Sequence, residues 1–238
     1  MWPDAAAFAH RAQLSELMDE PCSYAEFHAC LRDLMQVNRV VLSYRPTLRW
    51  LRQVAAEVRR PLHIVDVGSG AGDMLRRIEA WARRQRVDVC LTGIDLNPHA
   101  AQAAREFTPA SSAIRWVTGG VFDFAPDERI DIVISSLFVH HLGEAEIVRF
   151  LAWMERTAAI GWFINDLKRA RGSYVGFSIL SRVMRWHRFV QHDGPVSIQR
   201  AFTASDWERY AGEARVNRNA IRIYDAWPGR LCVGRVKA

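Results

Sequence analysis

Residues 65–75, VDVGSGAGDML, decide the fold of this chain of 238 residues. The run 62–68, LHIVDVG, is short and continuously apolar, which is typical of a strand buried on both faces of a parallel sheet. Gly68, Gly70 and Gly72 follow directly and lead into an amphipathic helix. Because glycine has no Cβ, this turn can bring the backbone close to a bound ligand. The stretch therefore predicts a strand, a ligand-binding turn and a helix.

The same alternation continues to the C-terminus and predicts a doubly wound α/β fold, ending in a helix and a hairpin around Pro228-Gly229. Strands are predicted at 62–68, 89–96, 114–119, 130–138, 161–167, 220–227 and 230–236, and helices at 71–85, 98–107, 144–157 and 203–214.

Two further segments are expected to be helical. Residues 1–60 predict an N-terminal helical extension that acts as a lid, with helices at 4–18, 23–41 and 46–60. An aromatic and arginine-rich segment near 172–200 interrupts the alternation and predicts a helical insertion over the C-terminal edge of the sheet. We expect residues 61–238 to form the catalytic domain around that insertion.

The composition excludes several classes of protein. Half of the residues are hydrophobic, which suits a globular core, and no apolar run approaches the roughly 20 residues of a membrane span. The net charge is +6, but the 32 basic residues are spread along the chain, and only Lys168 and Lys237 are lysine. We therefore expect no nucleic-acid partner. The scattered cysteines and the lack of an export signal predict a cytoplasmic protein with reduced thiols.

Acidic residues around the glycine turn indicate which ligand it holds. A dinucleotide-binding turn would have a small residue at position 73, where this chain has Asp73. Asp66 would repel a pyrophosphate but suits a cation. Asp95 ends the second strand, where a carboxylate can accept both ribose hydroxyls. An adenosine ligand with a positive end and no phosphate fits all three, and S-adenosyl-L-methionine is such a ligand.

With these motifs the chain resembles the class I S-adenosylmethionine-dependent methyltransferases. VDVGSGAGDM, GIDLNPHA and DIVISSLFVHHL are similar to the first, second and fourth-strand motifs of that family, over residues 61–168. The resemblance implies a Rossmann-like seven-stranded sheet with an antiparallel last strand. LMDEP, LRDLMQVNR, INDLKR and HDGPVSIQRAFT resemble the ubiquinone/menaquinone-biosynthesis type and its bacterial relatives in phenolic and polyketide metabolism.

The resemblance also implies a set of cofactor-binding residues. Besides Asp66, the three glycines and Asp95, this set contains Arg45, Leu96, Val121, Phe122, Asp123 and Ser135. Arg45 is either a partner of the methionine carboxylate or a solvated surface residue. The family often has an acidic residue in a Gly-Asp pair after the third strand, whereas this chain has Gly119-Gly120. The adenine is then held by Asp123 from a shifted position, or by the Val121 backbone and Phe122 alone.

The fourth-strand motif indicates the class of methyl acceptor. SSLF differs from the D/N-P-P-Y/F motif of amine-directed nucleic-acid methyltransferases, so we expect a small molecule, with a phenolic, quinone-like or polyketide-derived oxygen favoured over carbon. The candidate bases are His141 and His192, because a histidine with a pKa near 6.5 can deprotonate a phenol. Asp166 would orient the substrate or cap the following segment.

Adjacent histidines are poor ligands for one metal, and side chains on a strand alternate faces, so no metal is expected and at most one of the pair at 140–141 faces the acceptor. An NAD-dependent oxidoreductase and a non-catalytic S-adenosylmethionine-binding partner are the alternatives from other classes. The oligomeric state stays open, with a homodimer among the alternatives.

Overall fold

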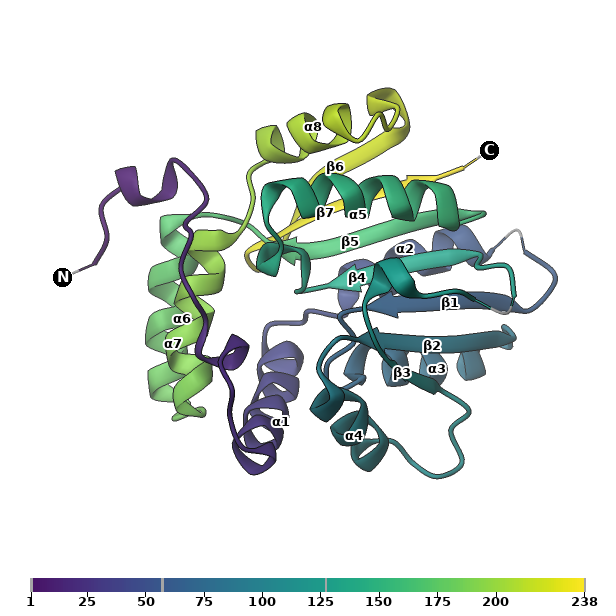
Figure 1. The fold of residues 1–238 in the computed structure, drawn as a ribbon, viewed down its shortest axis with the longest axis horizontal. Coiled ribbons are helices and arrows are strands. Elements are labelled where there is room, and N and C mark those ends of the chain that lie inside the picture. The colour runs from purple at the N-terminus through teal and green to yellow at the C-terminus, as the bar shows by residue number, and fades with distance from the viewer. Residues whose placement is uncertain (1, 57, 127, 238) are drawn as a thin grey trace.

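The seven strands form one sheet in the order β3-β2-β1-β4-β5-β7-β6, shown in Figure 1, a computed structural model that describes residues 2–56, 58–126 and 128–237. β1 to β5 are parallel, and β7 runs antiparallel between β5 and β6. The expected fold class is confirmed, with the reversed strand inserted inside the sheet. The strands are β1 (Leu62–Val67), β2 (Val89–Asp95), β3 (Arg115–Thr118), β4 (Ile132–Ser136), β5 (Gly161–Leu167), β6 (Ile221–Ala226) and β7 (Arg230–Val236).

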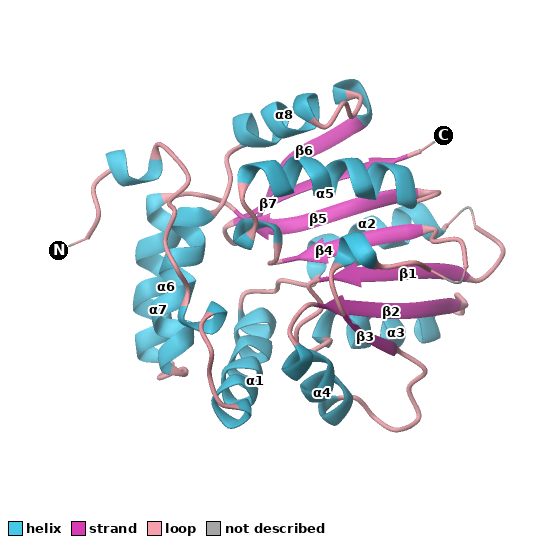
Figure 2. Cartoon of the chain, in the orientation of Figure 1, coloured by secondary structure: helices cyan, strands magenta, loops and turns pink. Residues whose placement is uncertain are grey.

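Helices cover both faces of the sheet and one of its ends (Figure 2). The α-helices are α1 (Tyr24–Val40), α2 (Arg45–Ala55), α3 (Asp73–Gln85), α4 (Pro98–Phe107), α5 (Glu144–Thr157), α6 (Arg171–Val183), α7 (Arg188–Arg200) and α8 (Ala204–Glu213). Short 3-10 helices are η1 (Ala6–Phe8), η2 (Leu17–Asp19), η3 (Val121–Asp123), η4 (Val139–His141) and η5 (Arg218–Ala220).

Two apolar cores explain why the strands read as continuously hydrophobic. On one face, α2 and α3 pack against the strands through residues such as Trp50 and Ile78. On the other face, α5 and α8 do the same through Phe150 and Trp207. Val65, buried on the second face, and Ile64, buried on the first, are neighbours in β1. Both faces of the strand are thus covered, as in other parallel sheets.

Three helices gather where the parallel strands end. Figure 1 shows α1, α6 and α7 beside the end of the sheet to which the arrows of β1 to β5 point. α6 and α7 form a helical hairpin over the segment near 172–200, and α7 contacts α1 and η2. Among the described residues, no helix has the length and apolar character that crossing a membrane requires. Residues of these helices and of the glycine turn line one cavity.

The predicted helix at 4–18 is wrong. The N-terminal strap, as we name residues 2–22, contains only η1 and η2 and otherwise runs irregularly along α6 and α7 (Figure 1). Arginine side chains from the main body bind its backbone: Arg169 Nε donates to the Phe8 carbonyl at 3.0 Å, and Arg200 Nη1 donates to the Leu14 carbonyl at 3.0 Å. Because an isolated helix of this length is marginal, such tertiary hydrogen bonds decide its conformation.

Candidate active site at the carboxyl edge of the sheet

A cavity of about 1390 Å³ lies at the carboxyl edge of the parallel strands. Its walls are the glycine turn after β1, the end of β2, the segment after β4, the N-terminal strap, α1, and the hairpin of α6 and α7. Single ligands typically occupy pockets of ~300–1,000 Å³. The cavity is therefore large enough for two molecules side by side.

The glycine turn forms the floor of the cavity. Gly68 and Gly70 both adopt left-handed backbone, with φ of 72° and 49°, which a residue with a Cβ rarely tolerates. A Cβ on Gly68 would also overlap the ring of Phe138, whereas one on Gly70 would reach only Leu31, at 3.9 Å. The backbone of the turn is thus unobstructed at Gly70, which lines the cavity, and is packed against Phe138 at Gly68.

Asp66 presents an unpartnered carboxylate to this cavity. The residue is 2% exposed, lines the cavity, and has no hydrogen-bond partner for Oδ1 in the described part of the chain. Burial raises the pKa of Asp66 well above its ordinary value, and the negative charges of Asp73 and Asp95 raise it further. A cationic ligand would remove this penalty, because an opposite charge favours the ionised carboxylate.

Asp95 is fixed in place by backbone donors. Its Oδ2 accepts from Gly70 N at 2.8 Å and its Oδ1 accepts from Asn97 N at 3.0 Å. Burial raises the pKa of Asp95, while these two hydrogen bonds oppose that rise. Each oxygen keeps a second lone pair, so the side chain can accept from a diol. Leu96, 75% exposed, lines the cavity beside it.

The three residues expected near the adenine do not line the cavity. Val121 is buried in the core on the α5 side, and Phe122 lies under the guanidinium of Arg149, at 3.9 Å from ring centroid to Cζ. Asp123 is exposed. The structure therefore brings none of them to the space that Asp66 and Asp95 face.

Three other expected cofactor contacts also lie outside the cavity lining. Arg45 is exposed at the start of α2. Gly72 caps α3, with a φ of 72°. Ser135 is buried, and its hydroxyl donates to the Val67 carbonyl at 3.0 Å, so the next residue, Ser136, lines the cavity in its place.

Both histidines of the adjacent pair reach the same site, contrary to the expectation from strand alternation. β4 ends at Ser136, and Leu137 has left-handed backbone, with a φ of 57°. The pair then lies in η4, where side-chain directions no longer alternate. The two imidazole rings are 4.3 Å apart between centroids, and both line the cavity. The premise that only one could face the site is wrong because the strand ends four residues earlier.

His140 is held by a buried carboxylate. The ring is 3% exposed, and its Nδ1 lies 2.7 Å from Asp166 Oδ1, while the His140 backbone N–H donates to Asp166 Oδ2 at 3.2 Å. Burial works against the charge of Asp166, but His140 and the Leu167 N–H hold the pKa of Asp166 below its ordinary value. An ionised Asp166 fixes the Nδ1–H tautomer, which leaves Nε2 as the basic nitrogen.

His141 interacts with two acids of the N-terminal strap. Its Nδ1 is 3.3 Å from Asp19 Oδ1, and its Nε2 is 3.8 Å from Glu16 Oε2. Burial alone would lower the pKa of His141, but the hydrogen bond to Asp19 and the charge of Glu16 raise it above its ordinary value. His141 is thus stabilised as the imidazolium.

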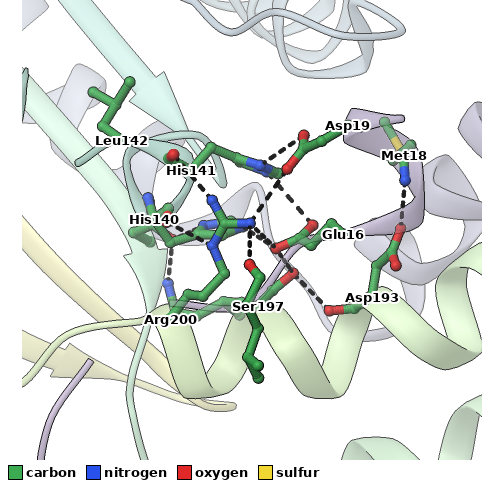
Figure 3. A network of polar contacts seen from close by, with 12 residues as sticks. Glu16, Met18, Asp19, His140, His141, Leu142, Asp193, Ser197 and Arg200 are labelled. Carbon is green, nitrogen blue, oxygen red and sulfur yellow. Dashed lines mark hydrogen bonds and ion pairs between the residues drawn. The ribbon is translucent and has the colours of Figure 1, made fainter. Parts of the chain in front are cut away.

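Arg200 of α7 contacts both histidines and Glu16 (Figure 3). It donates through Nε to the His140 carbonyl at 3.2 Å and through Nη2 to the His141 carbonyl at 3.0 Å. Its Nη1 lies 3.5 Å from Glu16 Oε1. We call Glu16, Asp19, His140, His141 and Arg200 the strap network.

Donor atoms of Glu16, His140 and His141 all lie within 4.8 Å of one another, a spacing that a metal ion could bridge. The guanidinium of Arg200 already lies beside the Glu16 carboxylate and would repel a cation there. We therefore interpret the cluster as an ion-pair network and assign no metal to it.

His192 is not brought to the cavity. Its side chain is 50% exposed, its Nδ1 contacts Asp193 Oδ1 at 2.7 Å, and it is not part of the cavity lining. Asp193 has a structural role, since it accepts from Leu17 N at 2.8 Å and Met18 N at 3.0 Å and so binds the strap to α7.

Sequence reasoning missed Glu16, His140 and Arg230, which all line the cavity. Glu16 stands one residue before LMDEP, inside the segment predicted as a helix, so its environment could not be inferred. For His140, the adjacent His141 is the residue that the sequence favours. Arg230 carries no local signal, because a buried arginine resembles any other arginine of this arginine-rich chain.

Comparisons with known proteins agree with this geometry. Residues 64–161 match the family described as methyltransferase domain. The plantazolicin methyltransferase BpumL in complex with SAH is similar in structure, with a TM-score of 0.64 and 15% identity over 89% of this chain and 95% of that chain. No curated protein sequence matches the chain.

Two further solved structures share the fold. Human N-acetylserotonin methyltransferase in complex with SAM has a TM-score of 0.62 and 14% identity, over 91% of this chain and 57% of that chain. Magnesium protoporphyrin IX methyltransferase from Synechocystis PCC 6803 with bound SAH has a TM-score of 0.56 and 12% identity, over 92% of this chain and 90% of that chain.

Residues 64–161 thus form a methyltransferase domain, and the strand order and the solved structures give the chain the Rossmann-like fold of the class I S-adenosylmethionine-dependent methyltransferases. The cofactor of this class is S-adenosyl-L-methionine.

Proposed function

We propose that the protein methylates an oxygen of a small aromatic molecule, with His140 as the general base. The observation that carries this proposal is the buried pair of His140 and Asp166, whose ring faces the cavity that the glycine turn also lines. Two of the similar structures are named for small acceptor compounds, N-acetylserotonin and magnesium protoporphyrin IX, which supports a small acceptor.

The residues at the ends of β1 and β2 fit S-adenosyl-L-methionine. Asp66 would face its positively charged methionine end, since the carboxylate is buried without a partner for Oδ1 among the described residues. Asp95 would accept the ribose hydroxyls, and the backbone at Gly68 and Gly70 leaves the turn open. When bound, the cofactor supplies a methyl group on a sulfonium, which makes it a good electrophile.

The acceptor side of the cavity is apolar and aromatic. α1 contributes Phe27 and Leu34, and the hairpin of α6 and α7 contributes Phe177, Leu180 and Phe189. Such walls favour a planar, poorly soluble acceptor over a sugar or a nucleic acid.

His140 would take the proton from the acceptor hydroxyl as the oxygen bonds to the methyl carbon and the bond from that carbon to sulfur breaks, which leaves S-adenosylhomocysteine. Asp166 keeps Nδ1 protonated, so the proton arrives at Nε2, and the imidazolium that forms is stabilised by the same carboxylate. Glu16 Oε1, at 3.9 Å from His140 Nε2, stabilises that charge from the opposite side. The methyl transfer itself then needs only alignment of the two molecules.

Replacement of His140 tests this proposal. We expect His140→Ala to lower kcat by ~10²–10⁴-fold, the usual contribution of a general base, with little change in the affinity for S-adenosylhomocysteine. The assay is transfer of the labelled methyl group to a panel of phenols, followed by product analysis for O- or C-methylation. His192→Ala should keep the rate near that of the unmodified protein, because its side chain does not line the cavity. If His140→Ala retains its kcat on an accepted phenol, His140 is not the base.

A further inference from the structure

Arg230, the first residue of β7, lines the cavity and has two hydrogen-bond donors that are unpaired among the described residues. The residue is 3% exposed and lines the cavity. Its Nη2 donates to Ser43 Oγ, but Nε and Nη1 have no partner within the described ranges. A buried guanidinium normally satisfies its donors, because an unpaired buried polar group costs free energy.

Asp166, the acid that interacts electrostatically with Arg230, makes no hydrogen bond to these donors. Asp166 lies within electrostatic range of Arg230, but its Oδ1 accepts from His140 Nδ1 and from Leu167 N, and its Oδ2 accepts from His140 N. Burial lowers the pKa of Arg230 to about 10, against the opposing charge of Asp166. The guanidinium is thus short of a direct counter-ion, and an anion in the cavity would supply one.

The position of Arg230 in the sheet indicates which molecule brings that anion. Arg230 pairs with Leu167 of β5, next to the Asp166 that orients His140. Two strands, β4 and β5, separate β7 from β1, which carries Asp66. At about 4.8 Å per strand, Arg230 lies roughly 14 Å across the sheet from the strand that begins the cofactor turn. It therefore belongs to the acceptor side of the cavity.

We propose that Arg230 binds a carboxylate of the methyl acceptor, so that the preferred acceptors are aromatic hydroxy acids. The inference rests on the proposed methylation of a small aromatic molecule and adds the acidic group that the acceptor carries. The free Nε–H and Nη1–H can each donate to a carboxylate oxygen. The acid would be anchored at β7 while its hydroxyl faces His140.

Binding measurements test the inference without requiring methyl transfer. The protein saturated with S-adenosylhomocysteine is titrated calorimetrically with 4-hydroxybenzoate and 4-hydroxycinnamate, and with the neutral amide of each. We expect the acid to bind about 10- to 100-fold more tightly than its amide in at least one pair, as charge-assisted hydrogen bonds contribute on this scale.

Variants then test whether the tighter binding of the acid depends on the guanidinium of Arg230. Arg230→Gln should abolish it, Arg230→Lys should keep part of it, and Arg222→Gln, which removes an exposed arginine of the adjacent strand β6, should keep all of it. Thermal unfolding and S-adenosylhomocysteine binding of each variant show whether it is folded.

Three results would overturn the inference: equal binding of acid and amide in both pairs, a preference that survives Arg230→Gln, or loss of S-adenosylhomocysteine affinity in folded Arg230→Gln and Arg230→Lys. The last result would indicate that the guanidinium binds the carboxylate of the cofactor instead of one on the acceptor. An acid preference that depends on Arg230, found together with an unchanged kcat in His140→Ala, would reject the proposed base and leave the anion site standing.

Discussion

The cofactor turn and the strap network lie in the same cavity but are built in opposite ways. The turn and its acids come from one stretch of about 30 residues, from Asp66 to Asn97, joined by backbone hydrogen bonds such as Gly70 N to Asp95. The strap network joins Glu16, His140 and Arg200, which are far apart in the chain. Local chemistry thus positions one half of the site, and long-range packing positions the other.

The two halves also differ in how completely their polar groups are satisfied. Asp66 Oδ1 has no partner within the described residues, so the turn is incomplete without a ligand. In the strap network, Glu16 accepts from Ser197 Oγ at 2.9 Å and lies beside Arg200, and Asp166, which binds His140 of the network, accepts three hydrogen bonds. Substitutions should therefore affect mainly ligand affinity in the turn and, apart from those of the proposed base His140, mainly stability in the strap network.

The largest effect is expected for Arg200→Ala. The change removes donors from the carbonyls of Leu14, His140 and His141 and leaves the Glu16 carboxylate without the guanidinium beside it. Breaking a buried charge pair in this way typically costs about 3–5 kcal/mol of unfolding free energy. Chemical denaturation measures this cost.

Arg209→Ala is the matched control for Arg200→Ala. Arg209 also pairs with two acids, Glu144 and Glu213, but on the surface, where a loss of only about 0–1 kcal/mol is expected. Equal losses in the two variants would show that the strap is not held by the network.

Asp95→Ala tests the cofactor turn, where we expect a substitution to change ligand affinity more than stability. Loss of two hydrogen bonds from a charged acceptor, at roughly 1.5–3 kcal/mol each, should weaken S-adenosylmethionine binding about tenfold or more. Stability should change little, because burial already penalises this carboxylate. Titration calorimetry gives the affinity, with the exposed Asp88→Ala as the control. Unchanged affinity would remove Asp95 from the cofactor site.

The smallest effect is a pH dependence of stability from the His141 and Asp19 pair. The pKa of His141 is raised in the folded protein, so its contribution is complete below its unfolded pKa of ~6.5 and is lost as the pH rises through the raised value. The pKa of Asp19 is lowered, because His141 and Arg200 outweigh burial, so its contribution is lost as the pH falls through that lowered value.

Because Asp19 is about half exposed, the pair should contribute at most about 1 kcal/mol. The denaturant midpoint of the unmodified protein, compared with that of His141→Asn between pH 5 and 8, should show the gap narrowing as the pH rises. A gap that widens with pH would contradict the imidazolium assignment.

Some features of the fold and the site were predictable from the sequence, and others were not. The strand at 62–68, the glycine turn and Asp95 were predictable, because each depends on a pattern within a few residues. The irregular conformation of segment 4–18 was not predictable, because Arg169 after β5 and Arg200 of α7 donate hydrogen bonds to carbonyl groups that a helix would use. That both His140 and His141 reach the cavity was not predictable for a related reason: it depends on where β4 ends, and Leu137, directly after β4, has left-handed backbone.

The sequence by itself determined a doubly wound α/β fold, the succession of its strands and helices from residue 62 to 167, and a turn suited to a cationic adenosine ligand, because apolar periodicity and glycine positions act locally. Only the tertiary structure decided which acids reach the two histidines, that Asp166 lies under His140, and that Arg230 is buried with unpaired donors. Charge pairing and burial depend on what the rest of the chain brings within a few ångströms, and the sequence contains no local record of those neighbours.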